Sequence, residues 1–198
     1  MTTFVLATHN EGKKRELLTI LGPVLGADTQ VLTAAEAGLA DVAETGVTFT
    51  ENALIKARAA AAATGHTAIA DDSGISVDVL GGAPGIFSAR WAGRHGDDRA
   101  NLELLLAQLG DIAAEHRGAQ FRCAAAAVTA DGREFTTEGV MPGRLAIEPK
   151  GENGFGYDPI FVPEGDDRTS AELTPAEKNE SSHRSRALRA LVPFLAEL

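Results

Sequence analysis

Apolar positions along the chain follow the periods of strands and helices in turn. Residues 3–7 form a short apolar run of strand length. After a polar loop, residues 15–21 place Leu17, Leu18 and Leu21 on one face of an expected helix. The start of the chain therefore predicts a strand, a loop and a helix, an order in which the helix N-terminus can bind phosphate through its backbone N–H groups.

The later elements are predicted by their boundary residues as well as by their periods. Thr48 and Glu51 form a capping box before an alanine-rich helix that Gly65 ends. Asp131 and Gly132 form a hairpin turn between two β-rich runs. Further strands are expected at residues 30–33, from 68 onward, and at 120–129, 134–141 and 160–162. Further helices are expected at residues 48–64 and 97–109. A second capping box, at Thr174 and Glu177, precedes a helical pattern in the C-terminal stretch.

An apolar run at residues 68–70 leads into Asp71, Asp72, Ser73 and Gly74. Successive side chains of a strand point to opposite faces, so Asp71 and Asp72 cannot face the same way. We interpret the stretch as a buried strand that ends here and presents one carboxylate to a substrate or metal and the other to supporting residues. A surface turn, which favours the same residue types, is the alternative on composition alone.

The composition is that of a globular protein with an acidic surface. The 198 residues suit one domain, 1–198. Because 28 Asp and Glu stand against 18 Lys and Arg, the net charge of −10 argues against nucleic acid or an anionic membrane as a partner. No apolar run is long enough to cross a bilayer, and no signal peptide is recognisable. The single cysteine, Cys123, excludes an intramolecular disulfide, and we expect a cytoplasmic protein.

The first polar loop, residues 8–14, contains donors and charges that suit a phosphate. Thr8 and Asn10 can donate hydrogen bonds, and Lys13 or Lys14 supplies positive charge. The spacing of a Walker loop is absent. A helix N-cap followed by solvated lysines explains the same residues about as well.

A second loop, residues 151–159, is rich in glycine and displays Phe155 and Tyr157. Aromatic side chains on a glycine loop suit stacking on a nucleobase, and a tight loop with its aromatics in the core is the alternative. Lys56, in an expected helix, is by itself most simply a solvated lysine. Glu51 already has a capping role, which lowers its chance of being catalytic.

Several segments stand in a characteristic order and spacing across nearly the whole chain. They are Leu6-Ala7-Thr8-His9-Asn10-Glu11-Gly12-Lys13, Phe49-Thr50-Glu51-Asn52-Ala53-Leu54-Ile55-Lys56-Ala57, Ala70-Asp71-Asp72-Ser73-Gly74, Gly81-Gly82-Ala83-Pro84-Gly85, Gly154-Phe155-Gly156-Tyr157-Asp158-Pro159, Ala176-Glu177-Lys178-Asn179 and Ser182-His183-Arg184. Each alone is a modest signal, but together they closely resemble the inosine triphosphate pyrophosphatases, which hydrolyse non-canonical purine nucleoside triphosphates. One departure is His9, where the family more often has a small residue.

The resemblance implies an α/β fold, in which a long mixed twisted sheet is flanked by helices and two lobes enclose a central cleft. Members of the family are typically homodimers and depend on Mg²⁺. The resemblance therefore implies that the chain hydrolyses inosine, deoxyinosine and xanthosine triphosphates (ITP, dITP and XTP) to the monophosphate and pyrophosphate, by metal-assisted attack of water at the α-phosphorus. Such an activity cleans the nucleotide pool.

The resemblance also implies roles for individual residues. It places Asp72 at the attacking water and the metal, as the catalytic residue, with Glu44 as a second metal ligand. The implied substrate ligands are Thr8, His9, Asn10, Glu11, Gly12 and Lys13 on the triphosphate with Lys56 nearby, Ser73, and, around the base, Phe155, Gly156, Tyr157, Asp158, Lys178, His183 and Arg184.

The chemistry of the substrate agrees with this allocation. Because the protein is acidic overall, lysines, a helix N-terminus and Mg²⁺ must neutralise a triphosphate locally. A carboxylate near the metal can orient and deprotonate a water. Hypoxanthine and xanthine carry a 6-keto acceptor where adenine carries a 6-amino donor, so donors from Lys178, His183 and Arg184 would favour the first two bases.

Two other interpretations differ from this one. A nucleotide-sensing module would keep both loops but would not need the carboxylates of Asp72 and Glu44. A pyrophosphatase for modified pyrimidine or methylated nucleotides would share a similar fold. The loop with Phe155 and Tyr157, combined with the donors near His183, favours a purine substrate instead.

Overall fold

The computed structural model of the protein describes residues 2–25 and 29–197, with the side chain of Glu11 left out. None of the described helices has the length and apolar character needed to cross a membrane. The strands are β1 (Thr2–Leu6), β2 (Thr29–Thr33), β3 (Thr67–Val77), β4 (Gly118–Val128), β5 (Glu134–Leu145) and β6 (Phe161–Pro163), and the helices are α1 (Glu11–Leu25), α2 (Phe49–Thr64), α3 (Asp98–Gln108), α4 (Pro175–Ser181) and α5 (His183–Leu195).

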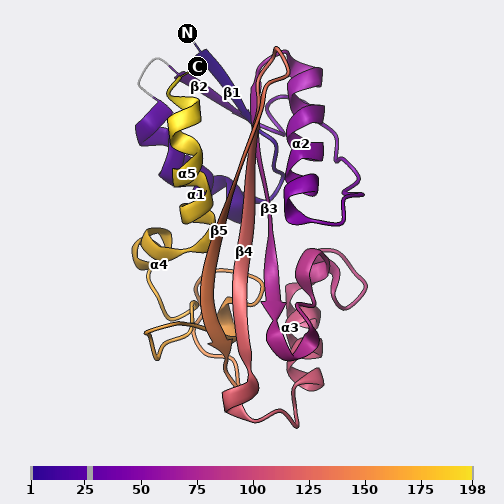
Figure 1. The fold of residues 1–198 in the computed structure, drawn as a ribbon, viewed down its shortest axis with the longest axis vertical. Coiled ribbons are helices and arrows are strands. Elements are labelled where there is room, and N and C mark those ends of the chain that lie inside the picture. Colours follow the sequence, from indigo (N-terminus) through magenta and orange to yellow (C-terminus); the bar gives the residue numbers. More distant parts are fainter. Residues whose placement is uncertain (1, 26–28, 198) are drawn as a thin grey trace. The chain divides into compact units, whose positions relative to one another are not determined.

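The strands form one mixed sheet in the order β2-β1-β3-β4-β5-β6. β1 runs parallel to both β2 and β3, whereas β5 runs antiparallel to β6. Helices flank this sheet (Figure 1). The predicted α/β class with a long mixed sheet is confirmed.

Two compact units make up the chain. Unit 1 consists of Met1–Asp72, Cys123–Gly139 and Arg184–Leu198, and unit 2 of Ser73–Arg122 and Val140–His183. The units correspond to the two lobes that the resemblance implies, and β3 passes from one to the other. The single pyrophosphatase domain and the central cleft stay predictions.

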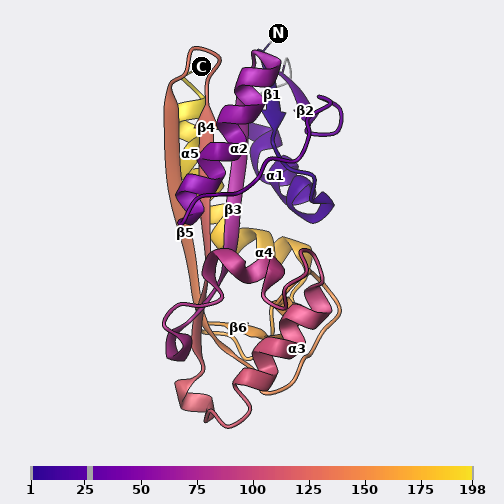
Figure 2. The same ribbon diagram turned by 90° about the vertical axis from the view of Figure 1, so that its right-hand side faces the viewer.

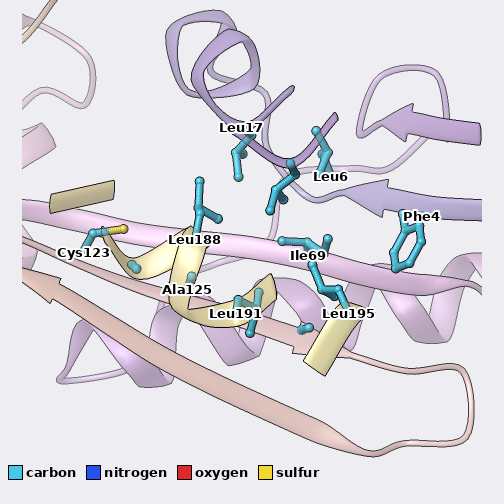
Figure 3. Packing of buried hydrophobic residues seen from close by; sticks show 12 residues of the cluster. Phe4, Leu6, Leu17, Ile69, Cys123, Ala125, Leu188, Leu191 and Leu195 are labelled. Atoms are coloured by element: carbon cyan, nitrogen blue, oxygen red, sulfur yellow. The ribbon is translucent and has the colours of Figure 1, made fainter. Parts of the chain in front are cut away.

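Unit 1 has an apolar layer on each face of its strands. α2 covers one face, where its alanines pack against Ala68 and Ala70 of β3. α1 and α5 cover the other face, where Leu17 and Leu188 pack near Ile69 (Figures 1 and 3). The alternation of residues 68–70 between the two layers is that of a strand buried on both faces.

Unit 2 has its own apolar core. Leu105 of α3 packs in a buried cluster with Phe121 of β4, Tyr157 and Phe161 of β6. The rings of Phe121 and Phe161 lie 4.5 Å apart, centroid to centroid, at an interplanar angle of 56°. Figure 2 shows α3 and β6 in this unit. The core supports the glycine-rich loop that precedes β6.

The predicted capping boxes at Thr48 and Thr174 and the helix end at Gly65 are confirmed. The Thr48 hydroxyl accepts from the Glu51 backbone N–H at 3.1 Å, and the Glu51 carboxylate accepts from the Thr48 N–H at 3.1 Å. Gly65 ends α2 with φ 69°, a left-handed conformation that glycine adopts without strain. The same reciprocal capping joins Thr174 and Glu177 at the start of α4.

Several details differ from the sequence-based expectations: α1 extends beyond the expected residues 15–21 at both ends, and β5 continues past Met141 to Leu145. β3 does not end at the acidic pair but continues to Val77, because Ile75 and Val77 extend the buried alternation into unit 2. The acidic pair therefore lies in the middle of a strand. Leu18 was expected on the inner face of the first helix but is 37% exposed, whereas Leu17 and Leu21 are buried in the core and Ile20 and Leu25 pack against it.

Candidate functional site

Asp71 and Asp72 project from opposite faces of β3. Asp71 contacts Arg184 of α5, on the face that α1 and α5 cover. Asp72 contacts Asn52 and Lys56 of α2, on the other face. The contacts confirm the predicted strand alternation and give the two carboxylates different surroundings.

The Asp71 carboxylate is buried and neutralised by neighbouring cations. Its Oδ2 lies 3.2 Å from Lys13 Nζ and accepts a hydrogen bond from Arg184 Nε at 3.1 Å. Burial alone would raise the pKa of Asp71, but the charges of Lys13, Arg184 and Lys56 outweigh it and hold the pKa well below the usual range. Asp71 therefore stays ionised and anchors a lysine that the sequence assigns to the triphosphate.

Arg184 is a buried arginine held by two carboxylates. Its Nε donates to Asp71 and its Nη1 donates to Glu16 of α1. Burial would lower the pKa of the guanidinium, but the charges of Asp71 and Glu16 outweigh it and raise the pKa above its usual value. These contacts tie α1, β3 and α5 together. The predicted role of Arg184 at the base stays a prediction.

The Asp72 carboxylate presents each oxygen to a different residue of α2. Oδ2 accepts a hydrogen bond from Asn52 Nδ2 at 3.1 Å, and Oδ1 lies 3.7 Å from Lys56 Nζ. Burial raises the pKa of Asp72 and outweighs the opposing charges of Lys56 and Lys13. A carboxylate with a raised pKa is a stronger base than an exposed one, which suits a group that removes a proton from water.

Lys56 lies between two carboxylates. Its Nζ donates to Glu44 Oε1 at 2.6 Å and lies near Asp72 Oδ1. Burial would lower the pKa of Lys56, but Asp72, Asp71 and Glu44 outweigh it and raise the pKa, so the ammonium stays charged. With a side chain only 16% exposed, Lys56 is not the solvated helix lysine that its position alone suggested.

The loop between β1 and α1 places its polar groups at the helix N-terminus. The Asn10 side-chain oxygen accepts from the Lys13 backbone N–H at 2.9 Å, the contact of an N-cap. The Thr8 hydroxyl accepts from the Asn10 N–H at 3.2 Å. Glu11 and Gly12 begin α1, and the Glu11 side chain lies outside the described residues. Asn10 therefore caps α1, while the Lys13 side chain contacts Asp71 and is largely buried.

His9 is exposed, as is the neighbouring Asn10. The His9 Nε2 lies 3.6 Å from Asp41 Oδ1, and the Asp41 side chain is 93% exposed. An exposed pair of this kind contributes little to stability. The contact still brings the loop of residues 41–47, which carries Glu44, beside the loop after β1.

The described ion pairs around Asp71 and Lys56 contain more acidic than basic groups. Three cations, Lys13, Lys56 and Arg184, contact four carboxylates, those of Glu16, Glu44, Asp71 and Asp72. A triphosphate placed here needs additional positive charge. The side chains that bind it must also exchange one ionic partner for another.

The donor set fits Mg²⁺. Asp72 and Glu44 offer carboxylate oxygens on either side of the same ammonium. Mg²⁺ prefers oxygen ligands and ordinarily takes one or two carboxylates from a protein, together with phosphate oxygens and water. Among the described residues no group of three or more His, Cys, Asp or Glu side chains is arranged to hold a metal ion.

In unit 2, the glycine-rich loop is closed by a buried carboxylate. Asp158 Oδ2 accepts from the Phe155 backbone N–H at 2.9 Å and from Lys178 Nζ at 2.7 Å. A Cβ at Gly154, which has φ 76°, would lie 2.8 Å from Asp158 Cγ, so only glycine fits there. The same Lys178 Nζ lies 4.9 Å from the centroid of the half-buried Phe155 ring.

The second aromatic of this loop is part of the core. Tyr157 is buried, and its hydroxyl donates to the Ser88 carbonyl at 2.8 Å. The Gly156 backbone N–H donates to Asp98 Oδ2 of α3 at 3.0 Å. Tyr157 thus packs in the core of unit 2, whereas Phe155 is half-buried.

His183 and Ser73 complete the predicted residues of unit 2. The His183 ring stacks on Phe121, with centroids 4.8 Å apart and an interplanar angle of 11°. His183 is buried, and Ser73 is half-buried where β3 enters the unit. The structure thus brings together Phe155, Asp158 and Lys178, and holds His183 against the core.

Three residues of these networks were not singled out from the sequence. Asn52, Glu16 and Asp98 each contact a predicted site residue. Asn52 had a detectable signal, because an asparagine in the buried alanine stripe of α2 requires hydrogen-bond partners. Glu16 and Asp98 had none, since acidic residues in the first turns of helices are common.

Comparison with known proteins agrees with the motif pattern. The model of the Ham1 family matches residues 4–194. A dITP/XTP pyrophosphatase of Streptomyces coelicolor is 61% identical over 204 residues, covering 100% of this chain and 99% of that protein. The crystal structure of a nucleoside-triphosphatase, a dITP/XTP pyrophosphatase, from Mycobacterium abscessus has a TM-score of 0.79 at 51% identity, covering 97% of this chain and 100% of its own.

A structure of a HAM1 protein from Coxiella burnetii has a TM-score of 0.89 at 41% identity and covers 100% of both chains. The match thus extends over both units and includes every segment on which the sequence resemblance was based. The chain belongs to the Ham1 family.

Proposed function

We propose that this protein hydrolyses ITP, dITP and XTP to the nucleoside monophosphate and pyrophosphate. Family membership and the activity for which its relatives are named support this function. The observation that carries it is the placement of Asp72 and Glu44 on either side of Lys56, where a carboxylate base, a carboxylate pair for a metal and a phosphate-binding cation lie together.

Residues of unit 1 bind the triphosphate in this proposal. The Lys13 and Lys56 ammonium groups supply positive charge, and the N-terminus of α1 supplies backbone N–H groups. Thr8, His9, Asn10, Glu11 and Gly12 line the approach to that helix. As the bond from the α-phosphorus to the bridging oxygen breaks, the two lysines stabilise the charge that develops on pyrophosphate.

Asp72 acts as the general base. Its carboxylate removes a proton from the water whose oxygen bonds to the α-phosphorus. Asp72 and Glu44 are the residues that would hold Mg²⁺, which when bound neutralises phosphate oxygens and polarises the phosphoryl group. Asn52 Nδ2 and Lys56 Nζ keep the Asp72 carboxylate oriented.

Residues of unit 2 bind the base. Phe155 offers a ring face for stacking, within a loop that Asp158 and Gly156 hold in place. Lys178 and His183, with Arg184 of unit 1 and Ser73 at the start of unit 2, are the proposed polar contacts. Donors aimed at a 6-keto group would leave a 6-amino group unpaired, which disfavours ATP.

A pyrophosphate-release assay with Mg²⁺ over a panel of ITP, dITP, XTP, ATP, GTP and dTTP tests this function. Chromatography of the products must show the monophosphate. We expect kcat/KM for ITP to exceed that for ATP by roughly 10⁴-fold, as for sites that hydrogen-bond a distinguishing group. Release of orthophosphate with a diphosphate product, or equal rates on ATP and ITP, would contradict the proposal.

The base-reading role of Arg184 is tested in the same assay. Arg184→Ala should lower kcat/KM for ITP more than for ATP, so the ratio of the two kcat/KM values should fall. An equal loss on both substrates would mean that Arg184 acts only through its bonds to Asp71 and Glu16. Light scattering of the purified protein tests the expected homodimer, and cell fractionation tests the expected cytoplasmic location.

A further inference from the structure

Asn52 is a buried polar residue that joins two parts of the unit 1 network. It lies on the first turns of α2 with no exposed surface. Its Nδ2 donates to Asp72 Oδ2 at 3.1 Å, and its Oδ1 accepts from the Gly46 backbone N–H at 2.8 Å. One amide therefore connects the strand that carries the proposed base to the loop of residues 41–47.

Only an amide side chain of this length satisfies both contacts. The Gly46 N–H requires an acceptor, which fixes the amide oxygen on that side and leaves the NH₂ group facing the carboxylate. An aspartate at position 52 would present a second negative charge to Asp72, and an alanine would leave both partners without this bond. The orientation of Asn52 thus follows from the chemistry of its neighbours.

The loop lies so close to Asn52 that the contact has little freedom. A Cβ at Gly46 would lie 2.7 Å from Asn52 Oδ1 and 2.6 Å from Glu51 Cβ, closer than side chains tolerate. The next two backbone N–H groups, of Val47 and Thr48, both donate to the Glu51 carboxylate, at 2.7 Å and 3.1 Å. Two residues before Gly46, Glu44 bonds Lys56.

We propose that Asn52 is a positioning residue, which holds the Asp72 carboxylate and the Glu44 loop in one fixed arrangement and so sets the spacing of the two proposed metal-binding carboxylates. This inference rests on the proposed function. Residues that orient metal-binding side chains affect metal affinity or activity by about 10- to 100-fold. Asn52 lies on α2, the helix that also carries Lys56.

The test compares Asn52→Ala with Asn101→Ala. Asn101 is also a buried asparagine at the start of a helix, and its Oδ1 accepts from the Ala92 N–H at 2.7 Å, but in unit 2. We expect Asn52→Ala to lower kcat for ITP by about 10- to 100-fold and to raise the half-saturating Mg²⁺ concentration by a similar factor, with the KM for ITP changed by less than about threefold. Asn101→Ala should cause a comparable loss of thermal stability without the Mg²⁺ shift.

A second readout needs no substrate. Hydrogen exchange of the Gly46 amide should accelerate in Asn52→Ala and stay at the parent rate in Asn101→Ala, because only the first variant removes its acceptor. Unchanged exchange at Gly46, or an Mg²⁺ requirement equal to that of Asn101→Ala, would overturn the proposal. If the parent hydrolyses no triphosphate, the proposed function fails, and the exchange measurement alone still decides whether Asn52 positions the loop.

Gly46→Ala provides the same test if Asn52→Ala does not fold. Gly46 is half-buried in a mostly exposed loop, so the substitution leaves the core intact. Because the new Cβ is too close to Asn52 Oδ1, the loop must shift and the half-saturating Mg²⁺ concentration should rise at least about threefold. A Gly46→Ala enzyme with the parent's Mg²⁺ dependence would refute the proposed arrangement.

Discussion

Arg184 donates a hydrogen bond from Nε to Asp71 Oδ2 over 3.1 Å, although the two residues are 113 positions apart in the sequence. Both side chains are buried, and Lys13 Nζ approaches the same carboxylate oxygen. The bond therefore links the first turn of α5 to the middle of β3 and, through the lysine, to α1. This carboxylate therefore joins a buried ion pair to a lysine that we propose binds the triphosphate.

Arg184→Ala should strongly destabilise the protein. It removes the guanidinium between Asp71 and Glu16 and leaves a buried carboxylate with less compensation. Breaking a buried ion pair from one side costs about 3–5 kcal/mol in free energy of unfolding. Urea denaturation measures this loss. Arg99→Ala is the control, because Arg99 is 88% exposed in its pair with Glu103. Similar losses of free energy of unfolding in the two variants would show that the buried contacts of Arg184 stabilise the protein no more than an exposed ion pair does.

The two adjacent aspartates should respond in opposite ways to the same substitution. Asp72→Asn removes the proposed base and should lower kcat by about 10²- to 10⁴-fold with little change in stability. Asp71→Asn should cost less activity but more stability, because it leaves Lys13 and Arg184 beside a neutral amide. Steady-state rates and urea denaturation of both variants test this. The reverse order of rates would show that the base is Asp71.

Lys56→Ala should weaken turnover because it removes positive charge near the departing pyrophosphate. We expect kcat/KM for ITP to fall by about 10²- to 10³-fold, as when one stabilising donor is lost from a transition state. Lys13→Ala should act in the same direction. Lys150→Ala is the control, since its side chain is 56% exposed and lies 3.6 Å from Glu148. If all three variants have the parent's kinetics, the two lysines do not bind phosphate.

Cys123 should be unreactive in the folded protein. It is buried against the Asp71 side of β3, with Sγ 3.9 Å from Asp71 Oδ2. Burial raises the pKa of the thiol, and the charge of Asp71 raises it further, so little thiolate forms at neutral pH. Iodoacetamide should label the thiol only after unfolding in urea, and Cys123→Ala should keep its activity. Labelling of the native enzyme at the rate of a small thiol would contradict this.

Local chemistry was predictable from the sequence. The capping box of Thr48 and Glu51 and the turn at Gly132 depend on residues within a few positions of each other, and both are confirmed. The opposite orientation of Asp71 and Asp72 follows from the strand period alone. Each of these features depends only on residues that are close together in the sequence.

Contacts between distant segments were not predictable in the same way. Glu16 and Arg184 are 168 positions apart, and no local pattern indicates that they pair. The expected strand also ended too early, at the acidic pair, because residues such as Asp72 and Gly74 are common in turns. The observed β3 continues to Val77. A buried strand tolerates these residues only where partners such as Asn52 and Lys56 surround them, and the partners come from the tertiary fold.

The ionic pairs of unit 1 also determine how binding depends on salt. Lys13 and Lys56 each already contact a carboxylate. In the proposed function, a nucleotide that binds these lysines must therefore replace a carboxylate of the protein as their partner. Because salt screens the contacts that are lost as well as those that are gained, the affinity should vary with ionic strength less steeply than the charge of a triphosphate alone would suggest.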